Sequence, residues 1–147
     1  WRINADIWRV NIRRRKGDPK YIGPAGWSNA LYNADQLTSQ KPAIMVEGEF
    51  DVLLLHQVAD DLITPVATGS TSGARRLHWA NKLSVCPTVL VSFDADEAGD
   101  EARKYWLRIL SNGKHWRPPW GDVSDMHRDG YDLRAWIADG LRYHSNS

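Results

Sequence analysis

The stretch Thr88-Val89-Leu90-Val91-Ser92-Phe93-Asp94-Ala95-Asp96-Glu97-Ala98-Gly99-Asp100 decides the fold. Its apolar, β-branched first half predicts a strand buried on both faces, and a helical pattern then runs to about Leu110. Asp94 and Asp96 therefore lie where a strand ends, the edge at which open α/β sheets bind ligands. Two carboxylates one residue apart repel each other unless a cation such as Mg²⁺ neutralises them. The simpler alternative is a helix start with solvated acids, because Asp and Glu favour the first helical turn.

The chain beyond residue 42 repeats this order of strand and then helix. We expect strands at 43–46, 63–67 and 88–93, an edge strand at 115–120, and helices at 52–59, 74–83, 97–110 and 132–141. Strands joined through helices predict an α/β fold with a parallel four-stranded sheet flanked by helices. The expected domains are a basic β-rich part at 1–42, a catalytic domain at 43–128 and a C-terminal helical extension at 129–147.

The front of the chain is a small basic β unit. Trp8, Val10 and Ile12 alternate with polar residues, which predicts a strand with one packed face, and residues 20–22 can return as a second strand after a turn. Residues 1–42 carry a formal charge of +5 and residues 43–147 a charge of −4. A basic front suits phosphate backbones and an acidic body suits metal ions, although an excess of solvated arginines is the alternative.

Length and composition restrict the class of protein. With 147 residues, 42% hydrophobic, the chain can bury one ordinary core. Cys86 is the only cysteine, which excludes an internal disulfide and a multi-cysteine zinc site and is compatible with a reducing cytoplasm. No run suits a membrane span or a signal peptide. Because the sequence begins at Trp1, we expect an excised domain of a larger protein.

Acidic residues follow three of the predicted strands. Glu47 follows the first strand, Asp94 and Asp96 the third, and Asp122 and Asp125 the fourth. The carboxyl ends of parallel strands lie along one edge, so these acids are expected to converge on one site. Taken singly, each has a structural alternative, either a helix-start carboxylate or an N-cap.

These residues resemble the Toprim domain of primases, topoisomerases and some nucleases. The sequences Glu47-Gly48-Glu49-Phe50-Asp51 and Phe93-Asp94-Ala95-Asp96-Glu97-Ala98-Gly99 are similar to its glutamate and Asp-x-Asp motifs. Lys20-Tyr21-Ile22-Gly23-Pro24 and Ala67-Thr68-Gly69-Ser70 resemble further segments of bacterial, phage and mobile-element primases. The likeness runs from about Val10 to Asp125.

Two departures from the primase pattern stand out. No lysine lies near Asn29 or Ala30, where primases usually carry one. The third acidic motif is Asp122-Val123-Ser124-Asp125 in place of an Asp-Pro-Asp-like motif, so Asp122 is the better match and Asp125 the weaker.

The resemblance implies a metal-dependent primase core that makes short RNA primers on single-stranded DNA from ribonucleoside triphosphates. It implies Mg²⁺ or Mn²⁺, two ions, and a replicative helicase contacted through regions outside this chain, in the bacterial cytoplasm. The implied catalytic residues are Glu47, Asp94 and Asp96, with Asp122 and Asp125 as further metal ligands. Glu47 is either a ligand or the group that handles the proton, and Asp51 supports the site from behind or caps a helix.

Candidate contacts to nucleotide or nucleic acid come from two regions. The basic front supplies arginines, lysines and an aromatic ring, and the 68–73 loop precedes a helix with two arginines. The residues are Arg13, Arg14, Arg15, Lys16, Lys20, Tyr21, Gly69, Ser70, Arg75 and Arg76. A solvated edge strand and an ordinary strand-to-helix turn are the alternatives.

Two other functions remain open. A Toprim nuclease would use the same acids to deliver water, and a non-catalytic module would only bind nucleic acid. A topoisomerase is disfavoured, because it needs a nucleophilic tyrosine and no tyrosine here has a recognisable context.

Overall fold

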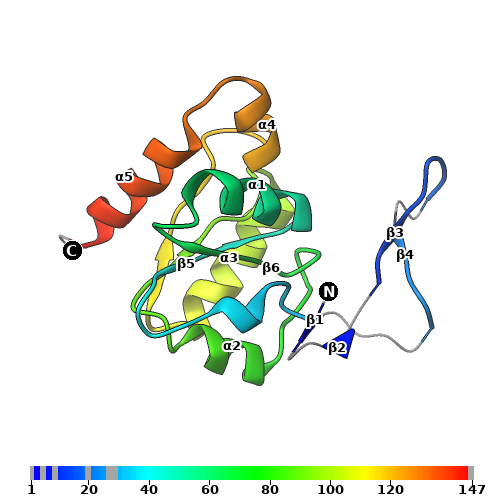
Figure 1. The fold of residues 1–147 in the computed structure, drawn as a ribbon, viewed down its shortest axis with the longest axis horizontal. Helices are drawn as coiled ribbons and strands as arrows, with labels where there is room; N and C mark the ends of the chain where they lie inside the picture. Colours follow the sequence, from blue (N-terminus) through cyan, green and yellow to red (C-terminus); the bar gives the residue numbers. More distant parts are fainter. Residues whose placement is uncertain (1, 4–5, 8–9, 19–20, 26–29, 146–147) are drawn as a thin grey trace.

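A four-stranded parallel sheet forms the centre of the structure, in the order β6-β5-β7-β8 (Figure 1). The computed structural model describes residues 2–3, 6–7, 10–18, 21–25 and 30–145. The strands are β5 (Ala43–Val46), β6 (Thr64–Ala67), β7 (Val89–Val91) and β8 (Gly113–His115), and every neighbouring pair is parallel. Every residue of β5, β6 and β7 is buried, as expected for strands with both faces covered. The predicted α/β fold is confirmed.

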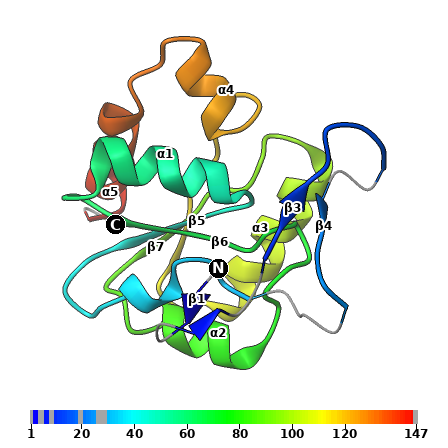
Figure 2. The same cartoon turned by 45° about the vertical axis from the view of Figure 1, so that its right-hand side comes forward.

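Among the described residues, five α-helices cover the two faces of the sheet. The helices are α1 (Glu49–Ala59), α2 (Leu77–Leu83), α3 (Glu97–Ile109), α4 (Val123–Arg128) and α5 (Leu133–Ser145). Residues of α2 and α3 share one hydrophobic cluster with the sheet, and residues of α1, α4 and α5 share the other. The body therefore has three layers, with the sheet in the middle (Figures 1 and 2).

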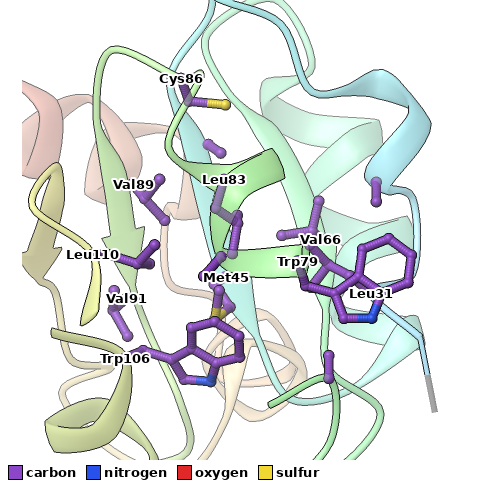
Figure 3. Close-up of a cluster of buried hydrophobic side chains, with 14 of the residues drawn as sticks. Leu31, Met45, Val66, Trp79, Leu83, Cys86, Val89, Val91, Trp106 and Leu110 are labelled. Carbon is purple, nitrogen blue, oxygen red and sulfur yellow. The ribbon is translucent and has the colours of Figure 1, made fainter. Parts of the chain in front are cut away.

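The larger cluster shows why these helices pack where they do. Figure 3 shows Trp79 of α2 and Trp106 of α3 among Met45, Val66 and Val91 of the sheet. Trp79 and Trp106 are 2% and 0% exposed. Trp136 on α5 is also buried, so all three of these tryptophans belong to the core.

The N-terminal segment differs from its prediction in packing. It contains two antiparallel pairs, β1 (Arg2–Ile3) with β2 (Asp6–Ile7) and β3 (Ile12–Arg13) with β4 (Tyr21–Ile22). The predicted return of the chain after the turn is confirmed, but the predicted packed face is wrong, because Val10 and Ile12 are 40% and 51% exposed. A two-stranded hairpin alone is too small to bury an apolar face of its own. Trp8 and Arg9 lie outside the described residues.

Two other segments depart from expectation. The edge strand predicted at 115–120 is wrong in position: β8 ends at His115, because Pro118 and Pro119 cannot donate to a ladder. The helix α4 was not predicted, since six residues are too few to show a period.

The boundary expected at residue 42 stays a prediction. Ala30, Leu31 and Ala34 are buried in the cluster of Figure 3, and Ala34–Gln36 form a 3₁₀ helix. Tyr32 pairs with Ala67 of β6 through backbone hydrogen bonds of 2.8 and 3.3 Å. Residues 30–36 thus pack against the sheet. Among the described residues, no helix combines the length and the apolar character needed to cross a membrane.

Candidate metal and nucleotide site

The predicted acids lie along the carboxyl edge of the sheet. Glu47 directly follows β5, and a hollow of about 220 Å³ opens beside the segments that follow β7 and β8. Its lining residues are Asp94, Ala95, Asp96, Gly121, Asp122 and Asp125. The Ala95 N–H donates to the Gly121 carbonyl at 2.7 Å, which ties the two walls of the hollow together.

Glu47 belongs to the same cluster electrostatically. The pKa of Asp94 is raised to about 7, first by burial and then by the charge of Glu47, followed by Asp51, Asp122 and Asp96. The pKa of Glu47 is raised by burial and by the charges of Asp96, Asp51 and Asp122. Carboxylates on four separate segments therefore repel one another, which is the electrostatic environment that a cation would relieve.

Asp96 is placed by the start of α3. Its Oδ1 accepts a hydrogen bond from the Gly99 N–H at 2.7 Å, so it is the N-cap of the helix. Gly99 has a second role: a Cβ there would collide with the backbone carbonyl of Asp94. Only glycine permits this approach between α3 and the turn that carries Asp94.

Asp122 is placed in the same way by α4. Its Oδ1 accepts from the Asp125 N–H at 2.6 Å. Asp96 and Asp122 are thus both helix N-caps, as the structural alternative expected. Each cap uses only one carboxylate oxygen, so both residues also line the hollow. Asp125 differs, since its carboxylate forms an ion pair with Arg128 at 2.7 Å.

Asp51 is a buried acid on α1 close to Asp122. It is 6% exposed, and its Oδ1 accepts hydrogen bonds from both the N–H and the hydroxyl of Ser124. Its pKa is raised to about 6, mainly by burial. Asp51 thus joins the first turn of α1 to the first turn of α4, next to Asp122.

Sequence analysis missed Arg103, which fixes the turn that carries Asp94. The Arg103 side chain is 2% exposed, and its guanidinium donates to the backbone carbonyls of Phe93 and Asp94 and forms an ion pair with Asp100. Asp100 in turn binds Arg117 at 3.1 Å. The sequence signal that could have identified Arg103 is its position on the apolar face of α3, which also carries Ala102 and Trp106.

The 68–74 loop lies against the acids. The Gly69 N–H donates to the Glu47 carbonyl at 2.9 Å. The Thr71 backbone lowers the pKa of Glu47, against the larger upward effects of burial and of the charges of Asp96 and Asp51. The Ser70 carbonyl accepts from the Thr68 hydroxyl at 2.7 Å. The Gly69 N–H is thus bonded to the Glu47 backbone, and contact of this loop with a phosphate stays a prediction.

The predicted basic contacts fall on two sides. Arg13 lies 5.9 Å from the ring centre of Phe50 at the start of α1, and a hollow of about 620 Å³ is lined by Arg13, Arg14, Arg15, Lys16 and Gly17. Arg75 and Arg76 are exposed at the start of α2. Lys20 lies outside the described residues, and Tyr21 is described only as part of β4.

The donor set fits a hard divalent cation. Glu47, Asp94, Asp96 and Asp122 supply carboxylate oxygens, the ligands that Mg²⁺ and Mn²⁺ prefer. Within the described residues, no three acidic, histidine or cysteine side chains lie close enough together to hold an ion as they stand. Binding of an ion would therefore require these carboxylates to come closer together.

Comparison with known proteins agrees with this fold. The model of the Toprim-like family matches residues 44–127. The primase fragment of the bacteriophage T7 primase-helicase protein is 21% identical with a TM-score of 0.71, over 94% of this chain and 58% of that chain. The structure of the zinc-binding and RNA polymerase domains of Aquifex aeolicus primase is 25% identical with a TM-score of 0.70, over 90% of this chain and 37% of that chain.

A third structure shares the fold. The RNA polymerase domain of Mycobacterium tuberculosis primase DnaG is 21% identical with a TM-score of 0.64, over 91% of this chain and 50% of that chain. The present chain thus spans less than two thirds of each of these chains. Because the family model covers more than half of the present sequence, the chain belongs to the Toprim-like family.

Proposed function

We propose that this chain is the catalytic core of a DNA primase, which transfers nucleotides from ribonucleoside triphosphates to a growing RNA primer on single-stranded DNA. The observation that carries the proposal is the electrostatic coupling of Glu47, Asp94, Asp96 and Asp122 at one edge of the sheet. The match to the Toprim-like family and the shared fold of primase domains support it.

We assign metal binding to Glu47, Asp94, Asp96 and Asp122, with Mg²⁺ or Mn²⁺ as the ion and two ions in the site. Asp125 is the weaker ligand, because Arg128 already neutralises it. Bound cations supply the charge neutralisation that phosphoryl transfer requires. The raised pKa of Glu47 suits a ligand and also suits a group that accepts the proton of an attacking hydroxyl.

The basic residues at 13–16, with Lys20 and Tyr21, are proposed to contact template or nucleotide. In support, Arg13 lies over Phe50, and Asn11 donates a hydrogen bond to Glu49, so the hairpin lies beside the helix that begins next to Glu47. The proposed partners are single-stranded DNA, ribonucleoside triphosphates and a helicase that binds regions outside this chain. We propose the cytoplasm as the compartment.

The test is a synthesis assay with labelled ribonucleotides, Mg²⁺ or Mn²⁺ and a single-stranded template. A primase gives short labelled RNA that depends on the cation, and Asp94→Ala abolishes it. Asp139→Ala is the control, since Asp139 lies on α5 and is paired with Arg142. Shortened template would indicate the nuclease, and retention of DNA without turnover would indicate a binding module. Full synthesis by Asp94→Ala would refute the site assignment.

A further inference from the structure

Two arginines share one tyrosine ring beside the 68–74 loop. The Cζ of Arg75 lies 4.5 Å from the ring centre of Tyr105, and the Cζ of Arg108 lies 5.8 Å from it. We call Arg75, Tyr105 and Arg108 the cationic patch. The half-buried ring packs against the core, so it is a fixed support for two side chains that would otherwise be mobile.

The charge of the patch is not neutralised locally. Both arginines are exposed, and no carboxylate among the described residues forms an ion pair with either of them. Glu101 acts on Arg75 only at a distance, because its carboxylate is bound by Lys104 at 2.6 Å. Arg75 uses one nitrogen to bind the Thr71 carbonyl at 2.8 Å and keeps its other donors.

The patch is connected to the acidic edge through the 68–74 loop. The Thr71 carbonyl accepts a hydrogen bond from Arg75 at 2.8 Å, and the Gly69 N–H of the same loop donates to the Glu47 carbonyl at 2.9 Å. The loop thus contacts Glu47 at one point and Arg75 at another. An anionic chain with one end near the acids would meet these guanidinium groups as it crosses the loop.

We propose that the cationic patch binds the phosphate backbone of single-stranded template DNA. The inference rests on the proposed function and adds to it a route for the template over α2 and α3. Two guanidinium groups held on one rigid ring suit successive phosphates of a polymer, because each one is a separate bidentate donor. A phosphate contact made by arginine carries no sequence preference.

The experiment measures binding of a fluorescent oligo-dT of about 16 nucleotides without divalent cation, as a function of salt. Arg75→Ala and Arg108→Ala should each make the slope of log affinity against log salt less steep by about 0.7. That change corresponds to roughly fivefold weaker binding at 0.1 M salt. Arg142→Ala is the matched control: it removes the same charge from the opposite face of the sheet and should leave slope and affinity unchanged.

The ring is tested with a second pair of variants. Tyr105→Phe keeps an aromatic face for both arginines and should bind DNA like the original chain. Tyr105→Leu keeps both charges but not the ring, and should weaken binding two- to threefold with little change in slope. Circular dichroism and thermal melting check that each variant is folded.

The outcomes separate this inference from the proposed function. Unchanged binding by Arg75→Ala and Arg108→Ala overturns the inference, even if the chain makes primers. Loss of binding in both variants supports it, even if the chain transfers no nucleotide. If Arg75→Ala and Arg108→Ala raise the KM for nucleotides but leave DNA binding unchanged, the patch binds triphosphate and the inference is overturned. The inference is also overturned if these variants bind an RNA oligonucleotide more weakly but bind DNA as the original chain does.

Discussion

Asp51 on α1 accepts two hydrogen bonds from Ser124 on α4, at 3.1 Å from the N–H and 2.5 Å from the hydroxyl. The bonds cross between segments that are 73 residues apart and end beside Asp122. They fix the first turn of α4 against the first turn of α1. The hollow keeps its shape partly because of this pair.

Ser124→Ala should destabilise the chain by about 1–2 kcal/mol, because a buried carboxylate loses one of its two donors. Synthesis activity should fall further than stability explains, since Asp122 loses the support behind its loop. Urea unfolding and primer synthesis at matched folded fraction measure the two effects. Ser84→Ala is the matched control, because its hydroxyl bonds a helix carbonyl away from the acids. Equal activity of the two variants would contradict the role given to Ser124.

Arg103→Met should be more harmful than Arg103→Lys. Methionine fills similar space but leaves the Phe93 and Asp94 carbonyls without this donor, at a cost of roughly 1–3 kcal/mol for each unsatisfied group. Lysine keeps a charge and one donor, so it should recover part of the loss. The measurements are urea unfolding and the Mn²⁺ concentration that half-saturates a thermal-shift response. If the methionine variant binds Mn²⁺ as the original chain does, Arg103 does not position the turn.

Gly99→Ala should destabilise the chain by about 1–3 kcal/mol and disable the site, because the new Cβ would press on the Asp94 backbone, which cannot move aside cheaply. Gly130→Ala is a useful comparison. Its Cβ meets nothing within 4 Å, but its φ of +80° costs alanine about 1–2 kcal/mol. Both variants should melt earlier, and only Gly99→Ala should lose cation binding in the thermal-shift assay. Loss of cation binding in both would point to general destabilisation.

The stability of the chain without cations should fall as pH rises. The folded-state pKa of Asp94, about 7, lies above its usual 3.8, so its contribution to stability is complete below about pH 4 and is lost as pH rises through about 7. Asp51 acts in the same direction, with its loss centred near pH 6. Arg134 lowers the pKa of Asp61 to about 2, so the contribution of Asp61 to stability changes only below pH 4.

Thermal melting between pH 5 and pH 8 tests this sign. The melting temperature should decline over that interval, and Asp94→Asn should flatten the decline, because amide nitrogen and oxygen carry no charge to repel. Mg²⁺ or Mn²⁺ should raise the melting temperature more at pH 8 than at pH 5. Parallel profiles for the original chain and Asp94→Asn would show that Asp94 does not titrate in this range.

Local sequence determined the elements that build the sheet and the positions of the acids along it. Val89–Val91 and Ala43–Val46 are short, apolar and followed by helix-start residues, so strand, turn and helix could be predicted without the fold. The packed face expected of Val10 and Ile12 was wrong for the reverse reason: alternation shows that a face is apolar but not that anything covers it. The edge strand predicted at 115–120 was wrong in position because that range includes Pro118 and Pro119, whereas β8 ends at His115.

Tertiary structure decided which groups act together. No sequence pattern links Arg103 to the carbonyl of Asp94, Ser124 to Asp51, or Arg75 and Arg108 to one tyrosine, because these pairings depend on how helices pack against the sheet. The sequence by itself determined that carboxylates follow parallel strands, since local periodicity encodes strands. Only the folded chain sets the distances between those carboxylates, and their mutual repulsion, because charge interaction depends on separation in space.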